Sequence, residues 1–431
     1  MFVYSKRFYY AKFGNLHMVR TSYDDKYDFV NAFDCPYDAG NLNMNYNRCA
    51  LIDKDVPYEY LFTAFREAEE YKECGDDISP IHVNGYFIGA NHGNPNTIDV
   101  YTDEHMLDEA AIGEQVCDDE HVYTVIQVQD SSRLLLAYLN GNGQTEVAEV
   151  GRTLRFEDPV NKALAGVEIK VKGSCMHMNL RPCGNSRNSA VFGDGEIAQS
   201  NRFYDEITVL DNYNILDFCD VVQYLRENTG KNTNRSYFEN DIAAALANMS
   251  VKHVFDEKGR VSTYHEVEFL KTAHLDFWFG AQQINFTHDE TAWFNAPCSE
   301  YDKGWHRAKM GTEIRKSGET VPNVFYMADS EIRKGYYLYL DPEYGTGTDE
   351  CRKDLPKAAK VSEWRTKLYC YAAADQEMAP GTKLALAYSK GPFDPAKSAA
   401  ENGYFTLNGK KHQAAGLFTS SSFTETAPSG T

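Results

Sequence analysis

Three histidines lie within 30 residues of one another in the first third of the chain. His92 stands between alanine-asparagine and glycine, and His105 and His121 each follow a run of acidic residues. An imidazole with an ordinary pKa of about 6.5 can take or give a proton at neutral pH. This pattern fits acid–base catalysis by His92 and His105, and it equally fits ordinary hydrogen-bonded turn residues. Imidazoles beside carboxylates also bind zinc or manganese, so His92, His105 and His121 are the metal ligands if a divalent metal is a cofactor.

The residues around His92 predict a tight turn that presents the imidazole at the edge of a sheet. Residues 85–88 have the composition of a short strand, and Gly89-Ala-Asn-His-Gly93 follows directly. Glycine on both sides allows positive φ and lets a ligand approach the backbone closely. We therefore expect His92 at the edge of a sheet, with Asn91 beside it to hold a substrate.

Residues 176–188 contain two arginines and several amides after a strand-like segment, and we predict a loop there. Arg181 and Arg187 could each clamp a carboxylate through two parallel hydrogen bonds. The alternative is a solvated loop whose arginines pair with some of the 63 acidic residues.

The segment 261–270 alternates apolar and polar residues. Period two places Tyr264, Glu266 and Glu268 on one face, which either lines a cleft or is the wet side of a sheet. Trp278 lies in the next aromatic segment, and a tryptophan beside polar groups can stack on the apolar face of a sugar ring, although tryptophans more often lie in a core.

Aromatic residues make up 13% of the chain, which favours strands. Turn residues separate apolar alternation at 251–256 and 261–270, and at 121–129 and 133–139, as antiparallel hairpins require. We expect residues 275–280 to form a third strand beside the first of these hairpins. Further strands are predicted at the following segments: 167–172, 202–210, 335–340, 366–371 and 383–388.

Helical periodicity is convincing at 58–71 and 215–226. The sequence thus predicts a mainly β protein of large antiparallel sheets, stacked as a β-sandwich, with a few short helices. A β-propeller is the alternative, but no propeller repeat is present. We expect an N-terminal β-rich part at 1–230, a C-terminal antiparallel part at 231–418 and a flexible tail at 419–431.

The chain of 431 residues has a net charge of −20. Because phosphates would be repelled, we expect neither nucleic acid nor an anionic membrane as a partner. The sequence has no signal-peptide pattern and no apolar run of about 20 residues, so we expect a cytoplasmic protein, or a secreted one if a leader was removed. The ten cysteines are scattered without CxxC spacing, which favours reduced, packed thiols. Homo-oligomerisation is left open.

The Gly-x-Asn-His-Gly turn at 89–93, the aromatic-rich strands and the loop arginines resemble the β-rich polysaccharide lyases of gut and marine bacteria. The resemblance rests on residues 75–130. It implies removal of the C5 proton of a uronic acid by histidine or tyrosine while a positive or amide group neutralises the carboxylate.

The sequence therefore predicts a carbohydrate-active lyase that needs no cofactor, or a divalent metal. His92 would be the base or acid, Tyr264 or Tyr101 the complementary proton donor, and Arg181 or Arg187 the carboxylate clamp. The first alternative is a glycoside hydrolase that uses two carboxylates, drawn from four candidates: Asp205, Glu206, Glu266 and Glu268. The second is a carbohydrate-binding β-protein without catalysis.

Overall fold

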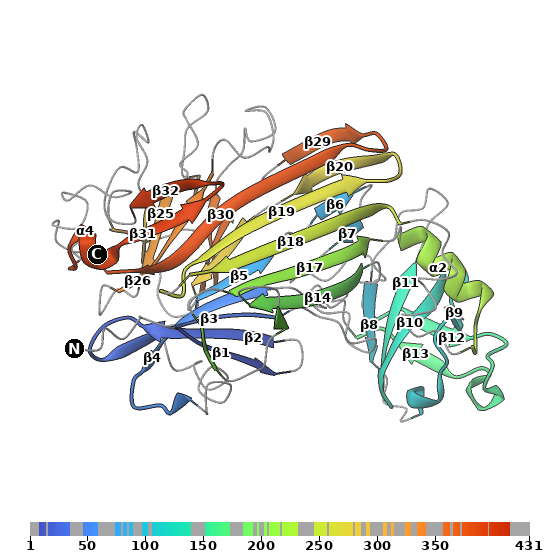
Figure 1. The fold of residues 1–431 in the computed structure, drawn as a ribbon. Helices are drawn as coiled ribbons and strands as arrows, with labels where there is room; N and C mark the ends of the chain where they lie inside the picture. The colour runs from blue at the N-terminus through green and yellow to red at the C-terminus, as the bar shows by residue number, and fades with distance from the viewer. Residues whose placement is uncertain are drawn as a thin grey trace.

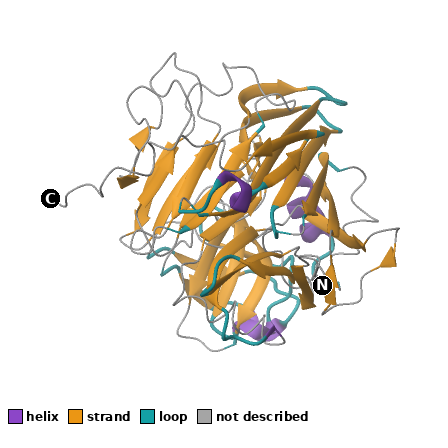
Figure 2. Ribbon diagram, turned by 60° about the vertical axis from the view of Figure 1, so that its left-hand side comes forward, coloured by secondary structure: helices purple, strands orange, loops and turns teal. Residues whose placement is uncertain are grey.

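The structure of the chain is a computed structural model. The described residues are the following: 8–13, 16–34, 46–58, 74–78, 81–83, 86–88, 97–101, 106–138, 151–172, 184–192, 196–197, 202–204, 207–215, 218–231, 245–256, 258–278, 281–285, 290–293, 305–307, 312–313, 324–328, 334–341, 357–362, 365–370, 373–394 and 396–413. Strands dominate this part of the chain, and its helices are short (Figures 1 and 2). The predicted mainly β, antiparallel fold is confirmed.

Two ten-stranded sheets form the body of the molecule. In the first, here the β1 sheet, the strands lie in this order: β16 (Arg202–Tyr204), β1 (Phe8–Phe13), β2 (Leu16–Ser22), β3 (Tyr27–Asp34), β4 (Tyr46–Asp53), β5 (Cys74–Ile78), β21 (Ala281–Asn285), β28 (Arg365–Cys370), β27 (Lys357–Ser362) and β24 (Thr312–Glu313). In the second, here the β19 sheet, the order is as follows: β15 (Glu196–Ile197), β14 (Gly184–Phe192), β17 (Ile207–Ile215), β18 (Ala247–Phe255), β19 (Val261–Phe269), β30 (Lys383–Phe393), β26 (Gly335–Leu340), β25 (Val324–Ala328), β22 (Glu290–Trp293) and β23 (Trp305–Arg307).

The two large sheets pack face to face through apolar side chains. One buried cluster joins β1 and β2 to β17, β18 and β19, and its members are the following: Phe8, Tyr10, Val19, Ile207, Val209, Phe255 and Val261. Burial of such side chains is the main favourable term in the stability of a sandwich. Both sheets contain strands from either side of residue 230, while the domain limits predicted from the sequence stay a prediction.

Residues 97–172 build a smaller sheet with its own core. Its strands lie in this order: β13 (Glu168–Lys170), β12 (Thr153–Phe156), β9 (Gln115–Cys117), β10 (Val122–Asp130), β11 (Arg133–Tyr138) and β8 (Thr97–Tyr101). The helix α2 (Phe218–Glu227) lies against β10 (Figure 1). Short 3₁₀ turns η3 (Leu107–Glu109) and η4 (Lys162–Leu164) close loops of this unit.

A four-stranded and a two-stranded sheet complete the described fold. The first has the order β29 (Ala373–Met378), β20 (Ala273–Trp278), β6 (Ile81–Val83) and β7 (Tyr86–Ile88). The second is the hairpin of β31 (Tyr404–Leu407) and β32 (Lys410–Gln413), which follows the short helix α4 (Ala399–Asn402). No helix in these described ranges is both long and apolar enough to cross a membrane.

The predicted hairpins are confirmed as β10–β11 and β18–β19, and the predicted helix at 215–226 is α2. The helix predicted at 58–71 lies outside the described residues beyond Tyr58. One expectation was wrong: β20 does not lie beside the β18–β19 hairpin in the same sheet. The other edge of β19 pairs with β30 along Val261–Glu268, so β20 instead pairs with β29 and β6.

Two described cysteines, Cys49 and Cys117, are free and buried, in agreement with the prediction of packed thiols. Burial, with a smaller effect of the nearby Glu157, raises the pKa of Cys117 to about 11, so this thiol is not a nucleophile at neutral pH.

Candidate functional site

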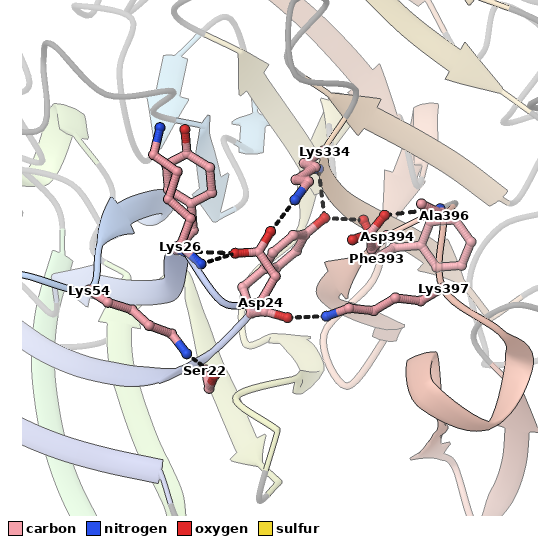
Figure 3. Close-up of polar contacts among 12 residues, drawn as sticks. Ser22, Asp24, Lys26, Lys54, Lys334, Phe393, Asp394, Ala396 and Lys397 are labelled. Atoms are coloured by element: carbon pink, nitrogen blue, oxygen red, sulfur yellow. Dashed lines mark hydrogen bonds and ion pairs between the residues drawn. The ribbon is translucent and has the colours of Figure 1, made fainter.

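A pocket of about 420 Å³ lies where the β2–β3 turn meets the segment after β30. Figure 3 shows side chains from both segments at this junction. The pocket is lined by residues of four chain segments, which are the following: Thr21, Ser22, Tyr23, Asp24, Asp25, Lys54, Lys258, Arg260, Pro392, Phe393, Asp394, Lys397, Glu401 and Asn402. Charged side chains of both signs therefore meet at one surface depression.

The turn between β2 and β3 is fixed by Asp24. Its Oδ1 accepts hydrogen bonds from the backbone N–H of Lys26 at 2.8 Å and of Tyr27 at 2.7 Å. An aspartate that satisfies the backbone two and three residues ahead is the usual device of a tight turn. This turn places Tyr23 and Asp24 against the C-terminal wall of the pocket.

Tyr23 joins the two walls. Its hydroxyl donates to the carbonyl oxygen of Phe393 at 2.6 Å and accepts from the backbone N–H of Gly335 at 3.2 Å. Burial, helped by the negative charge of Asp394, raises the pKa of Tyr23 well above its usual value. The hydroxyl therefore keeps its proton at neutral pH and acts as a structural link rather than as a base.

The wall formed by residues 394–402 is held by the buried Asn402. Its Oδ1 accepts from the N–H of Asp394 at 3.0 Å, and its Nδ2 donates to the carbonyl oxygens of Asp394 at 2.9 Å and Lys397 at 3.1 Å. Asp394 Oδ1 in turn accepts from the N–H of Ala396 at 2.9 Å. One amide thus fixes the loop that carries Lys397 and Glu401 to the pocket.

Three lysines of the lining donate hydrogen bonds to uncharged oxygens. Lys54 Nζ donates to Ser22 Oγ at 2.7 Å, and Lys258 Nζ donates to the carbonyl oxygen of Glu401 at 3.1 Å. Lys397 Nζ donates to the carbonyl oxygen of Tyr23 (Figure 3). A carbonyl or hydroxyl oxygen orients an ammonium group without cancelling its charge, but Lys54 Nζ also lies 4.0 Å from Asp28 Oδ1, and the same lining contains four carboxylates.

Arg260 contributes a fourth cation, and its side chain is only 3% exposed. Its Nη1 donates to the carbonyl oxygen of Tyr404 and lies 3.8 Å from Asp256 Oδ2. Among the described residues, no atom accepts a hydrogen bond from the buried Nε. A buried N–H without an acceptor costs about 1–3 kcal/mol, and more on a charged group.

Two carboxylates of the pocket, Asp24 and Glu401, are ionised at neutral pH. Burial acts to raise the pKa of Asp24, but hydrogen bonds from Lys334 and the Tyr27 and Lys26 N–H groups outweigh it, and the pKa falls below its usual range. Hydrogen bonds from the hydroxyl and N–H of Ser398 lower the pKa of Glu401. Neither group holds a proton that it could donate as a general acid.

Taken together, these groups can bind a polar or charged ligand, and the pKa values of Tyr23, Asp24 and Glu401 are all shifted away from neutrality. Throughout the part of the chain that the structure describes, no group of three or more histidine, cysteine, aspartate or glutamate side chains is arranged to hold a metal ion.

Several residues predicted for the site lie outside the described residues, namely the following: Asn91, His92, His105 and Arg181. Arg187 lies in β14, where its Cα pairs with that of Asn212 in β17. The prediction of a loop was therefore wrong for residues 184–188. This polar stretch lacks apolar alternation, and its strand forms because β17 offers a continuous partner. Trp278 ends β20, as expected of a strand residue.

Tyr264 and Glu266 lie on the outer face of β19, as period two predicted, while His265 and Val267 are buried. The Tyr264 hydroxyl oxygen accepts from the backbone N–H of Asn408 at 2.8 Å, in the β31–β32 turn. Tyr264 therefore helps to hold this hairpin on the sheet, and Glu266 is exposed. Their catalytic roles stay predictions.

Tyr101 and His121 belong to the six-stranded unit. The guanidinium carbon of Arg133 lies 4.7 Å from the centre of the Tyr101 ring. His121 Nδ1 lies 3.1 Å from Asp118 Oδ1 and also contacts Arg152, which is 3.0 Å from Asp118 Oδ2. The His121 side chain is thus held by Asp118 and Arg152 of the same six-stranded unit.

The described histidines with the deepest burial had no role in the predictions. His17, His253 and His265 are fully buried between the two large sheets, together with Lys390. Tyr10 Oη lies 2.9 Å from His17 Nδ1, and Thr263 Oγ1 lies 2.9 Å from His253 Nδ1. The period-two pattern of β18 and β19 places His253 and His265 on the inner face, and this pattern is the sequence signal that indicates their burial.

None of the predicted site residues is among the described residues that line the pocket. Lys258 and Arg260 belong to the turn predicted between the segments 251–256 and 261–270, and no further role was predicted for them. Their proximity to residues 392–402 depends on the pairing of β19 with β30, which local sequence does not reveal.

No family model matches the chain, and no curated protein matches it. Among solved structures, a galactose 1-epimerase from Lactobacillus acidophilus NCFM is similar at 10% sequence identity over 89% of this chain and 99% of that chain, with a TM-score of 0.24. A likeness at this TM-score carries no argument about fold or function.

Proposed function

We propose that the chain binds an acidic carbohydrate in the pocket between the β2–β3 turn and residues 392–402, and that it cleaves this glycan by β-elimination. The observation that carries the proposal is that Lys54, Lys258, Arg260 and Lys397 balance the four carboxylates of the same lining, in a chain of net charge −20. A sugar carboxylate would therefore be repelled less there than by the acidic remainder of the surface.

The size and the mixed polarity of the pocket support a sugar unit as the occupant. A volume of about 420 Å³ is within the range of small-molecule sites. Carboxylates such as Asp25 and Glu401 can accept hydrogen bonds from sugar hydroxyls, while the cations face the acidic group. The half-buried Pro392 offers apolar surface to the C–H face of a ring, whereas Phe393 is buried.

Elimination requires a neutralised carboxylate, a base and an acid. The base removes the proton at C5, the bond between C4 and the leaving oxygen breaks, and a C4–C5 double bond forms while the acid protonates the leaving oxygen. The pocket supplies charge neutralisation, which lowers the cost of the enolate-like transition state. His92, with Tyr264 or Tyr101 as partner, stays the proposed proton-transfer group on sequence grounds.

A second candidate function is carbohydrate binding without cleavage. The observation that favours it is that the pKa values of Tyr23, Asp24 and Glu401 are all shifted away from neutrality. Hydrolysis by Asp24 and Glu401 fits less well, because the lowered pKa of both groups leaves no general acid.

The test is incubation of the full chain with polyuronates of several linkages, followed by ultraviolet absorbance of the new double bond and by calorimetric binding. Cleavage that His92→Ala abolishes in a correctly folded protein is the expected result. Binding without a double bond would select the second candidate, and neither binding nor cleavage of any acidic glycan would refute the proposal.

A further inference from the structure

We infer that residues 396–413, here the C-terminal strap, dock on the β19 sheet and leave it as one unit, carrying one wall of the pocket with them. The strap comprises α4 and the β31–β32 hairpin, and it contributes Lys397, Glu401 and Asn402 to the pocket lining. The inference goes beyond the proposed function, because it concerns how the pocket opens and closes and not what the pocket binds.

The strap is not a strand of the sheet that it covers. Among the described strands, β31 and β32 pair only with each other. β31 nevertheless lies over β19 and β30 (Figure 1). Because an isolated two-stranded hairpin is only marginally stable in water, the hairpin depends on side-chain contacts with the β19 sheet for its order.

A single column of side chains holds the backbone of the strap. Every second residue from the β18–β19 turn into β19 contacts it, in the following pairs: Lys258 Nζ donates to the carbonyl oxygen of Glu401 at 3.1 Å, Arg260 Nη1 donates to that of Tyr404, Ser262 Oγ donates to that of Thr406 at 2.6 Å, and Tyr264 Oη accepts from the N–H of Asn408 at 2.8 Å. Side chains two residues apart in a strand share a face, so the column follows the outer face of β19. Water can replace each of these hydrogen bonds when the strap leaves the sheet.

Phe405 is the apolar anchor of the strap. Its ring is buried and stacks on the ring of Tyr337 in β26, with the ring centres 5.0 Å apart and the planes at 24°. Leu407 is fully buried on the same face of β31, whereas Tyr404 and Thr406 on the other face are exposed. Burial of this one apolar face is therefore the main force that keeps the strap docked.

The pocket exists only while the strap is docked. Lys397 Nζ donates to the carbonyl oxygen of Tyr23 on the opposite wall (Figure 3). Undocking separates Lys397 and Glu401 from Asp25 and Lys54, which belong to the β2–β3 turn and the segment after β4. A ligand that touches both walls therefore binds the docked state and favours it by its difference in affinity for the two states.

The experiment follows amide hydrogen exchange of the full chain by mass spectrometry, first without a ligand. We expect residues 404–413 to exchange together and about tenfold or more faster than residues 384–393 of β30, because undocking is a local opening whereas β30 opens only with its sheet. Exchange of the strap at the rate of β30 would overturn the inference.

A matched pair of aromatic variants tests the anchor. Phe405→Ala and Tyr404→Ala each remove one ring from β31, but the Phe405 side chain is 2% exposed and the Tyr404 side chain 49%. We expect Phe405→Ala to speed exchange across the strap about tenfold or more, as loss of a buried aromatic ring predicts, and Tyr404→Ala to change it much less. Ser262→Ala, which removes one hydrogen bond to the strap, should speed exchange severalfold. Equal effects of the two aromatic variants, or faster exchange in β30 together with the strap, would overturn the inference.

A ligand arm tests the link to the pocket, and this arm rests on the proposed function. The probe is D-glucuronate at a hundred times the dissociation constant measured by calorimetry. If only the docked state binds, exchange of the strap slows about a hundredfold while that of the six-stranded sheet stays unchanged. Bound glucuronate with unchanged strap exchange would overturn the link between strap and pocket. No binding of D-glucuronate or of a polyuronate would count against the proposed function, and the ligand-free exchange would still decide whether the strap undocks.

Discussion

The buried imidazole of His253 should make the protein sensitive to mild acid. His253 lies in β18 with no exposed surface, and Lys390, His17 and His265 lie near enough to oppose a further positive charge. Burial, with smaller effects of these three neighbours, lowers the pKa of His253 from 6.5 to about 3. The imidazole is therefore neutral in the folded protein throughout the neutral and mildly acidic range.

The sign follows from proton binding. Between pH 6.5 and about 3 the unfolded chain binds a proton at His253 and the folded chain does not. The free energy of unfolding is thus at its full value above pH 6.5 and falls as the pH drops toward 3. The slope is about 1.4 kcal/mol per pH unit, so His253 alone removes about 2 kcal/mol between neutral pH and pH 5.

The assay is urea unfolding followed by tryptophan fluorescence at a series of pH values from 4.5 to 8, on the wild type and on His253→Gln. Glutamine keeps a polar group beside Thr263 but cannot take the proton. We expect the variant to be less stable at pH 8 and to lose stability less steeply in acid. His274→Gln serves as the control, because the His274 side chain is 38% exposed and keeps its contact with water. Identical slopes for wild type and His253→Gln would show that the reasoning is wrong.

Two further substitutions test the packing of the fold by urea unfolding. Asp28→Asn should destabilise the protein by about 3–5 kcal/mol, because it leaves the buried charge of Arg20 uncompensated. The side chains of Arg20 and Asp28 lie 2.8 Å apart and are 0% and 2% exposed. A loss of stability below about 1 kcal/mol would contradict this prediction. Gly113→Ala should cost about 1–3 kcal/mol more than Gly166→Ala. Both glycines have positive φ, but a Cβ at Gly113 would overlap the carbonyl oxygen of Leu225 in α2, whereas one at Gly166 meets nothing within 4 Å; equal costs would argue against this packing.

The local β structure could be predicted because the alternation of apolar and polar residues in the sequence matches the alternation of buried and exposed side chains in the strands. The burial pattern of β18 alternates along its length, and in β19 the residues from Tyr264 to Val267 lie on the faces that the sequence predicts. These strands carry apolar residues on one face because that face packs on β1 and β2. The α2 helix was predictable for the same reason, with a periodic apolar side against β10.

The pairing of distant strands could not be predicted. β19 and β30 are separated by more than a hundred residues, and nothing in the 261–270 segment distinguishes β30 from β20 as its neighbour. The pocket depends on that pairing, because it brings Arg260 next to Phe393. Lys258 and Arg260 lie in a polar turn whose sequence is typical of a solvent-exposed hairpin, so the local sequence does not indicate that Arg260 is buried or that both residues line a pocket with Pro392 and Phe393.

Tyr23 and Phe393 are 370 positions apart along the chain and share a hydrogen bond at the centre of the candidate site. A fragment of the chain that contains only one of the two walls therefore cannot form the site. During synthesis, the pocket can assemble only after the ribosome has released almost the whole of the described chain. Ligand binding would then report complete folding, and a protease cut that frees residues 394–403 would remove one wall of the pocket and leave β30 in its sheet.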